Sequence, residues 1–228
     1  MRRTCPVPTT RRPPWPVRVR ATVSAPFGRY LSRQAARPRG PFGRLLGRIW
    51  LRETAAVNDV TLDLLAPAPG ERIGEIGFGP GRTLGLLAAA GAEVVGVEVS
   101  PTMLVAATRR NAGPVADGTM ALHQGDGTTL PWPDDDLDAV LSVHTFHFWP
   151  DPAATLADVA RVLRPGGRLV LTAPADDHPL PTRFDTDVYR VPSLADATDV
   201  LRTAGFVDVR VERRPDIVTT VWFTATAT

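Results

Sequence analysis

The sequence predicts an α/β fold: a Rossmann-like, seven-stranded, mainly parallel sheet with helices on both faces and a C-terminal antiparallel hairpin. Three observations lead to this expectation. From residue 72 onward, short segments rich in Val, Ile and Leu alternate with helical segments, as in parallel strands joined by crossover helices. A glycine-rich turn follows the first of these segments. The chain closes with two alternating segments around a Pro-Asp turn, the pattern of a hairpin.

Three helices are expected before the sheet, at residues 27–36, 42–52 and 54–66. The run Pro38-Arg39-Gly40-Pro41 separates the first two, because proline and glycine interrupt helical hydrogen bonding. The second helix carries an apolar face, with arginines elsewhere around it. We assign five residues to that face: Phe42, Leu45, Leu46, Ile49 and Trp50.

The alternating part then supplies the sheet and its covering helices. Ser100-Pro101 reads as an N-cap followed by proline at the first helical position, and Ser193 as a second N-cap. The expected strands are 72–77, 93–98, 120–124, 138–143, 168–173, 206–213 and 218–226. The expected helices are 82–90, 100–111, 152–163 and 193–204.

Length and composition suit a globular protein with one main domain. The 228 residues can bury a single core, and 43% are hydrophobic while 22% are charged. No apolar run approaches the roughly 18 residues that span a bilayer. Cys5 is the single cysteine, which excludes an intrachain disulfide and a cysteine metal cluster. This usage fits a reducing compartment, and we expect a cytoplasmic location.

Charge divides the chain into a basic arm and an acidic body. All 26 basic residues are arginines, and 13 of them lie before the first acidic residue, Glu53. Such arms can hold nucleic acid or an anionic membrane. The prolines of residues 1–24 favour a disordered tail, or one added by an upstream start codon. We expect three parts: a tail (1–24), an N-terminal helical lid or cap (25–66) and the α/β domain (67–228, core 73–174).

The glycine turn separates two cofactor classes that share this fold. The dinucleotide fingerprint G-x-G-x-x-G would require glycine where Arg82 stands, whereas the glycines here are Gly77, Gly79 and Gly81. Pro80 also removes a backbone N–H that a pyrophosphate could use. An acidic residue, Glu75, leads the turn. A carboxylate at this place suits a cofactor that carries positive charge.

These residues and four later segments resemble the class I S-adenosylmethionine-dependent methyltransferases of the type 11, ubiquinone/menaquinone-biosynthesis-like group. The matching segments are 70–88, 94–104, 123–149, 163–174 and 201–211. The resemblance implies S-adenosylmethionine as cofactor. It also implies in-line displacement of its methyl group by a small-molecule acceptor, so that no nucleophilic triad is required.

The resemblance also implies a set of cofactor-binding residues. Glu98 ends a strand about 20 residues beyond the turn, where a carboxylate accepts hydrogen bonds from ribose hydroxyls. Glu75 would hold the methionine ammonium group, Asp126 the adenine amino group, and Val99 and Met103 the adenine faces. The full set is Glu75, Gly77, Phe78, Gly79, Gly81, Glu98, Val99, Met103, Asp126, Gly127 and Val143.

Two histidines after the fourth sheet strand are the catalytic candidates. His144 could touch the sulfonium end or the acceptor, and His147 could take the acceptor's proton. Loop histidines with structural hydrogen bonds are the alternative. Residues 27–52 and 174–192 are expected to cover the pocket, the first as a lid that orders on cofactor binding. The candidate lining residues there are Tyr30, Gln34, Phe42, Phe184, Tyr189 and Arg190.

Several departures and alternatives remain open at this stage. Gly74 stands where the family has a bulky residue, so it weakens the strand or permits close packing. Asp134, Asp135 and Asp136 read as an exposed turn, not a metal site, and no metal is expected. A non-catalytic binding protein, an RNA methyltransferase guided by the arginine arm and an NAD(P)-dependent oxidoreductase are the alternative functions. Acceptor identity and oligomeric state stay open.

Overall fold

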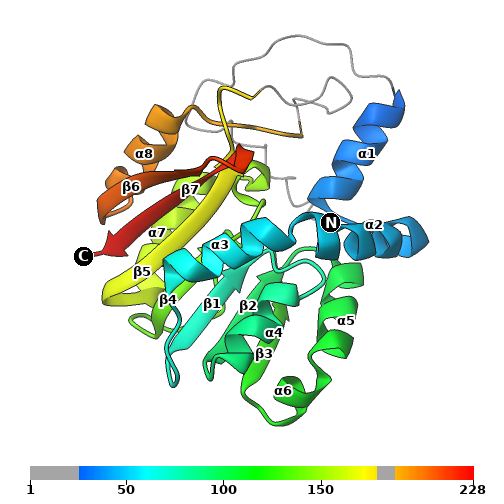
Figure 1. Cartoon of the computed structure of the whole chain (residues 1–228). Coiled ribbons are helices and arrows are strands. Elements are labelled where there is room, and N and C mark those ends of the chain that lie inside the picture. Colours follow the sequence, from blue (N-terminus) through cyan, green and yellow to red (C-terminus); the bar gives the residue numbers. More distant parts are fainter. Residues whose placement is uncertain (1–25, 179–187) are drawn as a thin grey trace, which may run out of the picture.

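A computed structural model describes residues 26–178 and 188–228. Its sheet (Figure 1) consists of β1 (Arg72–Ile76), β2 (Glu93–Glu98), β3 (Met120–Gln124), β4 (Leu137–Ser142), β5 (Leu163–Pro174), β6 (Phe206–Arg214) and β7 (Ile217–Ala227). The helices are α1 (Pro26–Ala36), α2 (Gly40–Glu53), α3 (Ala55–Leu65), α4 (Arg82–Ala89), α5 (Pro101–Arg110), α6 (Ala112–Ala116), α7 (Pro152–Val162) and α8 (Leu194–Thr203), with a 3-10 turn η1 (Phe146–Phe148). The expected tail, with Cys5, lies outside the described residues.

The predicted fold class is confirmed. The seven strands have the order β3-β2-β1-β4-β5-β7-β6, with β1 to β5 parallel and β6 and β7 antiparallel. The order reverses between β1 and β4, so their crossovers leave in opposite directions. In open parallel sheets this reversal leaves a crevice at the carboxyl ends of the strands. The candidate residues after β1, β2, β3 and β4 therefore meet at one edge.

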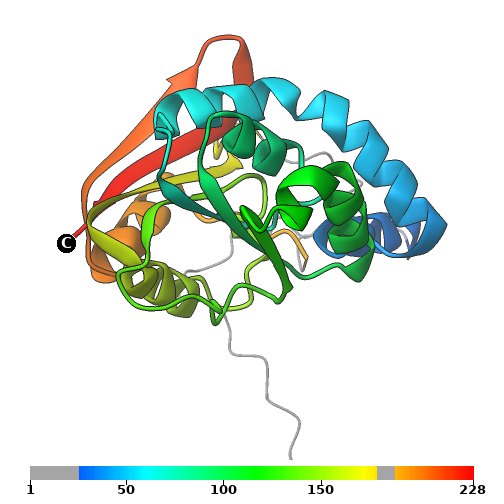
Figure 2. The same ribbon diagram turned by 90° about the horizontal axis from the view of Figure 1, so that it is seen from below.

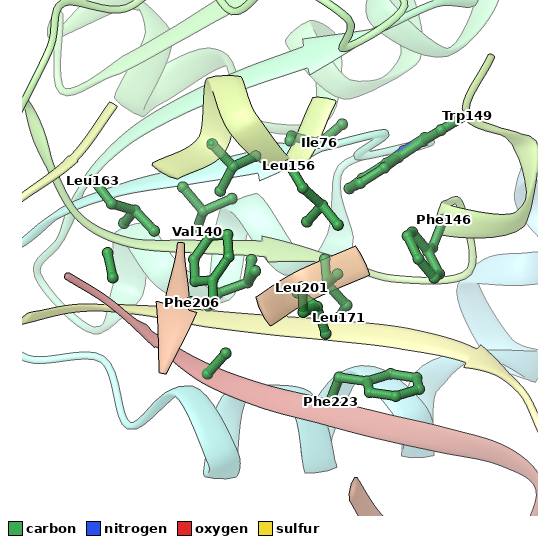
Figure 3. Packing of buried hydrophobic residues seen from close by; sticks show 14 of the residues in the cluster. Ile76, Val140, Phe146, Trp149, Leu156, Leu163, Leu171, Leu201, Phe206 and Phe223 are labelled. Atoms are coloured by element: carbon green, nitrogen blue, oxygen red, sulfur yellow. The ribbon is translucent and has the colours of Figure 1, made fainter. Parts of the chain in front are cut away.

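Strand alternation divides the core into two layers. Ile76 of β1 faces the layer with α7 and α8, whereas Ile73 faces the layer with α3, α4 and α5. The same alternation separates Phe223 from Trp222 in β7. Figure 3 shows the first layer, where Leu156 of α7 lies beside Ile76. Both faces of the sheet are covered, as the near-continuous apolar strands require.

Gly74 permits close packing. A Cβ at this position would lie 2.8 Å from Leu137 Cδ1 and 3.0 Å from a ring carbon of Trp132. The other departures from expectation concern short elements. β5 starts at Leu163, five residues early, because Leu137 of β4 pairs with it. The five-residue α6 and the three-residue η1 are too short for a periodic signal.

The predicted apolar face of the second helix is only partly correct, since Phe42, Leu46 and Trp50 are half-buried but Leu45 and Ile49 are not. α2 packs through Gly43 and Gly47, and a Cβ on Gly47 would lie 3.0 Å from Met103 Cε of α5. Glycine brings the two helices closer than any side chain would allow. Consequently Leu45 and Ile49 lie on the outside, 51% and 39% exposed. α1 and α2 sit to one side of the sheet, next to α5 (Figures 1 and 2).

Among the described residues no helix combines the length and the apolar character needed to cross a membrane.

Candidate functional site

A cavity of about 740 Å³ lies at the carboxyl ends of β1, β2 and β4. Its floor is the glycine turn, and its opposite wall comes from α1, α2 and the residues around η1. Most of the predicted cofactor residues line it: Glu75, Gly77, Phe78, Gly79, Glu98, Val99, Met103, Asp126 and Val143. The two predicted catalytic histidines, His144 and His147, line it as well. Segments separated by more than a hundred residues therefore share one site.

The turn after β1 takes a backbone path that favours glycine. Gly77 and Gly79 have φ angles of 74° and 52°, in the left-handed region. The Gly77 N–H donates to Val97 O at 2.7 Å, which holds the turn against β2. A Cβ on Gly77 would run into the Thr145 side chain, whereas nothing lies within 4 Å of the corresponding position on Gly79. Gly79 therefore leaves open space at the cavity wall.

Two predicted residues take part in the fold and not in the wall. Gly81 caps α4 with φ 76°, and a Cβ there would lie 2.7 Å from Ala107 Cβ of α5. Gly127 has φ 81°, and its Cβ would lie 2.9 Å from Ile76 Cγ2. Neither lines the cavity. Both glycines allow close packing behind the site.

Glu98 fixes the turn with its carboxylate. Its Oε2 accepts from the Gly79 N–H at 3.0 Å and its Oε1 from the Ser100 N–H at 2.8 Å. Only 5% of the residue is exposed. Burial raises the pKa of Glu98, opposed by these N–H donors and by the nearby Arg37 guanidinium. Each carboxylate oxygen keeps a further acceptor position, so the group can receive two ligand hydroxyls.

Glu75 is a buried carboxyl that lacks a full set of partners. It is 2% exposed, and its Oε2 accepts no hydrogen bond from any described residue. Burial, together with the charge of Glu98, raises the pKa of Glu75 to about 8, although the Thr83 side chain opposes the shift. A buried, unsatisfied carboxyl beside a cavity is costly unless a cation or donor reaches it. The position therefore suits a ligand ammonium group.

The adjoining wall supplies flat apolar contacts and one acceptor. Met103 is buried where α5 meets Gly47, and Val99 follows Glu98 at the end of β2. Asp126 is exposed after β3, and its Oδ1 accepts from the Thr128 N–H at 3.0 Å. Its other carboxylate oxygen remains available to a ligand. An apolar slot with an acceptor at one end can hold a purine ring that carries an amino group.

The histidines line a part of the wall that is otherwise aromatic and apolar. His147 is 3% exposed, its Nδ1 accepts or donates no hydrogen bond among the described residues, and its ring stacks on Tyr189 with centroids 5.1 Å apart. Burial lowers the pKa of His147 to about 3 and that of His144 to about 4. Both imidazoles are therefore neutral at neutral pH. His144 also has a left-handed φ of 57°.

The expected lining residues of the covering segments are only partly correct. Tyr189 lines the cavity, whereas Tyr30, Gln34 and Phe42 do not. Instead, the Gln34 amide donates to Tyr30 Oη at 3.2 Å, and the Tyr30 ring lies 5.7 Å from that of Phe42. Phe184 falls outside the described residues. The residues of α1 and α2 that do line the cavity are Leu31, Ala35, Ala36, Leu46, Trp50, Leu51 and Glu53, together with Arg37 and Pro38 between the two helices.

Arg190 supports the aromatic wall from behind. Its guanidinium donates to Trp149 O at 2.9 Å and to Phe148 O at 3.3 Å, and its backbone N–H donates to His147 O at 3.1 Å. It is not a lining residue. The carbonyl groups of Phe148 and Trp149 thereby accept hydrogen bonds, and Arg190 links the segment before α8 to the loop that carries His147. Contacts of this kind join residues about 40 positions apart, so no local sequence pattern predicts them.

Two of the three consecutive aspartates form ion pairs with arginines. Asp134 pairs with Arg161 at 2.6 Å, and Asp136 pairs with Arg72 at 2.8 Å. Within residues 26–178 and 188–228, no group of three or more Asp, Glu, His or Cys side chains could hold a metal ion. Asp138 accepts from the Arg72 N–H at 2.8 Å, which fastens the amino end of β1 to β4. This region stabilises the sheet.

Comparisons with known proteins agree with the geometry. A family model described as a methyltransferase domain matches residues 74–171. The uncharacterized methyltransferase YdaC of Bacillus subtilis is 30% identical over 171 residues, which cover 74% of this chain and 89% of that protein. A demethylmenaquinone methyltransferase of Clavibacter sepedonicus is 39% identical over 111 residues, 49% of this chain and 44% of that protein.

Solved structures show the same fold. A SAM-dependent methyltransferase of Aquifex aeolicus superimposes with a TM-score of 0.62 at 20% identity, over 75% of this chain and 89% of that one. By contrast, the chain spans only 34 to 59% of the length of several curated relatives that it matches. The part matched by the family model runs from within β1 to within β5.

Proposed function

The chain belongs to the class I S-adenosylmethionine-dependent methyltransferases, and from this premise we propose that it transfers a methyl group to a small, uncharged, largely apolar acceptor that carries a hydroxyl group. One observation supports this most directly. A single cavity joins a buried carboxyl with an unsatisfied oxygen, Glu75, to an apolar wall that carries two neutral histidines. The first feature fits the cofactor and the second fits the acceptor.

The residues present fit S-adenosylmethionine. Glu75 would take the ammonium group at its unsatisfied oxygen, and Glu98 the ribose hydroxyls at its free acceptor positions. Val99, Met103 and Asp126 would hold the adenine. When bound, the cofactor supplies a methyl group on a cationic sulfonium that an acceptor can attack in line. The aromatic residues beside it suit a cation, since ring faces attract positive charge.

The acceptor wall determines what this chain can position. Around the histidines it consists of Phe148, Trp149, Pro150, Pro174, Tyr189, Thr219 and Thr220, none of which carries a charge. An ionic acceptor would lose its hydration there without gaining a counter-ion. The name of one relative, a demethylmenaquinone methyltransferase, supports an apolar acceptor, and that of another, an O-methyltransferase of Penicillium expansum, supports a hydroxyl group on it. Holding the reactants together can contribute about 7–11 kcal/mol to the rate.

We assign proton removal to His147. Its Nδ1 has no partner among the described residues, and burial keeps the pKa of His147 at about 3, so the imidazole is in the form that accepts a proton. A hydroxyl becomes far more acidic as its oxygen gains the methyl group. The neutral imidazole of His147 can therefore take the proton as the methyl group is transferred. His144 forms the neighbouring wall.

We further propose that α1 and α2, and not α3, form the lid. Their residues line the cavity, and Ser100 Oγ of the α5 N-cap donates to Pro38 O at 2.5 Å, between the two helices. α3 packs its Val57 and Leu65 into the core. If residues 27–52 order on cofactor binding, limited proteolysis of this segment slows in the presence of S-adenosylhomocysteine. Cleavage at an unchanged rate would contradict the lid.

The single cysteine supports our further expectation of a cytoplasmic location.

The test is methyl transfer itself. The full chain is incubated with S-adenosylmethionine carrying an isotopically labelled methyl group and with a panel of phenols, hydroxyquinones and charged hydroxy acids. Mass spectrometry follows the labelled products and S-adenosylhomocysteine together. We expect labelled ethers or C-methylated rings from the uncharged members, and no product with Glu98→Ala. Cofactor binding without transfer to any member would favour the non-catalytic alternative, and transfer to RNA alone would contradict the small-molecule acceptor.

A further inference from the structure

The outer face of α2 combines exposed apolar side chains with uncompensated positive charge. We define the basic lid face as Arg44, Leu45, Arg48, Ile49 and Arg52 of α2 with Arg110 of α5. Most of these residues line one shallow groove, together with Leu51 and Glu53. None of these six residues lines the cavity of the proposed active site, although neighbouring residues of α2 do.

The apolar part of this face results from how α2 packs. The helix turns Gly43 and Gly47 toward the body, which leaves Leu45 and Ile49 one turn apart on the outside. They follow Phe42 by three and seven residues, and so extend its stripe along the helix. Exposed large apolar residues on one helix face are a mark of an interaction surface.

The charge of this region is positive up to the last residue of α2, Glu53, which also lines the groove. Residues 26–52 contain seven arginines and no acidic residue, and Glu53 is the first acid of the chain. Arg44, Arg48 and Arg52 are exposed at intervals of four, so they form a second stripe beside Leu45 and Ile49. None of the three forms an ion pair with another described residue. A partner with negative charge would therefore gain three free guanidinium groups from α2 alone.

We propose that the basic lid face docks on the surface of a bilayer that contains anionic lipids. A helix with arginines on one side and large apolar residues on the next lies in the plane of a membrane interface, apolar side chains inward. Arginine stems are long enough to keep the guanidinium at the phosphate level while Leu45 and Ile49 reach below it. A nucleic acid would satisfy the arginines but offers no apolar layer for these two side chains. The bilayer accounts for both stripes.

The same helix connects this surface to the cavity. Leu46, Trp50 and Leu51, which alternate along α2 with the exposed residues, line the cavity wall. Docking would therefore place the lid of the active site against the lipid phase, from which an apolar acceptor could enter. This last step rests on the proposed function, whereas the docking itself does not.

Vesicle flotation with the full chain tests the docking. Vesicles of phosphatidylcholine alone are compared with vesicles in which about one third of the lipid is phosphatidylglycerol. We expect binding to the anionic vesicles only, weakening as NaCl increases from about 0.05 to 0.5 M. The double variant Arg44→Gln/Arg48→Gln should lower the partition coefficient about 25-fold, from roughly fivefold per arginine. Leu45→Ser/Ile49→Ser should lower it about tenfold.

Matched controls lie outside the basic lid face. Val218 on β7 is as exposed as Leu45, and Arg202 on α8 is an exposed helical arginine. Val218→Ser and Arg202→Gln should leave the partition coefficient within about twofold. An equal loss of vesicle binding in these controls would overturn the proposal. Unchanged vesicle binding by the α2 variants would overturn it too, because residues 1–25 would then carry the binding. Binding of a single-stranded RNA without binding of vesicles would assign the face to nucleic acid.

The outcome stays separate from that of the proposed function. S-adenosylhomocysteine binding, followed by calorimetry, should be the same in the α2 variants as in the wild type because none of the changed residues lines the cavity. Loss of vesicle binding with retained cofactor binding would confirm the docking surface alone.

Discussion

The two halves of the cavity are built in different ways. On the cofactor side, a tight backbone turn and two buried carboxyl groups lie within 25 residues of each other, and backbone N–H groups hold Glu98 in place. On the acceptor side, the wall comes from α1, α2, η1, β7 and the segment before α8, and its side chains are apolar or neutral apart from Glu53 of α2. The first half is fixed mainly by hydrogen bonds of its carboxylates, and the second by packing together with the hydrogen bonds of Arg190.

This difference suggests a division of roles: the cofactor side would be common to the family, and the acceptor side would distinguish one member from another. Rigid backbone donors and carboxylates can recognise a fixed set of hydroxyl and ammonium groups. A packed apolar wall changes its shape with each substitution, and so can select a different acceptor at little cost to the fold. Substitutions on the cofactor side should therefore change cofactor binding, and those on the acceptor side should change turnover or KM alone.

The largest effect is expected for Glu98→Ala. The change removes both of the proposed ribose acceptors and leaves the Gly79 and Ser100 N–H groups without their partner. Binding of S-adenosylhomocysteine should weaken about 100- to 1,000-fold, because each charged hydrogen bond contributes roughly 1.5–3 kcal/mol. Calorimetry measures the loss. Glu93→Ala, at the exposed end of the same strand, is the control, and an equal loss in both would remove Glu98 from the site.

The second effect tests the acceptor side. His147→Phe should lower kcat about 100-fold, as expected for loss of a general base, while cofactor affinity changes less than about twofold. Phenylalanine retains the stacking on Tyr189. The exposed His123→Phe should have no effect. Because the pKa of His147 lies at about 3, the wild-type kcat should show no ionisation of this group between pH 5 and 8. An unchanged kcat in His147→Phe would assign the residue a structural role.

A smaller effect comes from Glu75 and depends on pH. With a pKa of about 8, the carboxyl is mostly protonated at pH 7. A ligand ammonium favours the ionised form, so binding should release a proton, and affinity should increase as pH rises from 6 to 8. Glu75→Gln should weaken binding about 30-fold at pH 8 and remove this dependence. Calorimetry in buffers of different ionisation enthalpy counts the protons. No proton release by the wild type would contradict the assignment of the ammonium to Glu75.

The same shift predicts how the ligand-free protein responds to pH. The Glu75 carboxyl ionises at about pH 4.5 when the chain is unfolded and at about 8 when it is folded. Its contribution to the free energy of unfolding is therefore retained below pH 4.5 and lost as pH rises toward 8. Glu75→Gln should raise the Tm at pH 8 relative to the wild type and leave it nearly unchanged at pH 4.5. Thermal unfolding at the two pH values measures the difference.

The smallest effect is expected in the lid. Trp50→Ala enlarges the apolar wall and should raise the KM for the acceptor about tenfold, with cofactor affinity nearly unchanged. Leu45→Ala, on the outer side of the same helix, should leave KM unchanged in assays without membranes. A change in cofactor affinity equal to the change in KM would mean that the lid is not specific to the acceptor side.

The sequence predicts the cofactor side better than the acceptor side. The turn, its carboxylates and the strand ends are local patterns, so their residues and spacing are enough to place most of them at one edge. Gly81 and Gly127 fit the same pattern but do not line the cavity. The sequence does not show this, because it depends on which side chains pack against the two glycines. The apolar periodicity of α2 does not reveal that glycines face the body. For that reason Leu45 and Ile49 are assigned wrongly, and Tyr30, Gln34 and Phe42 are misplaced.

The central claim is tested most directly by calorimetric titration of the wild-type chain with S-adenosylhomocysteine and, separately, with NADH at pH 7. We predict micromolar binding of the first with release of a proton, and no heat with the second. Binding of NADH, or of neither ligand, would contradict a cofactor site built around Glu75 and Glu98.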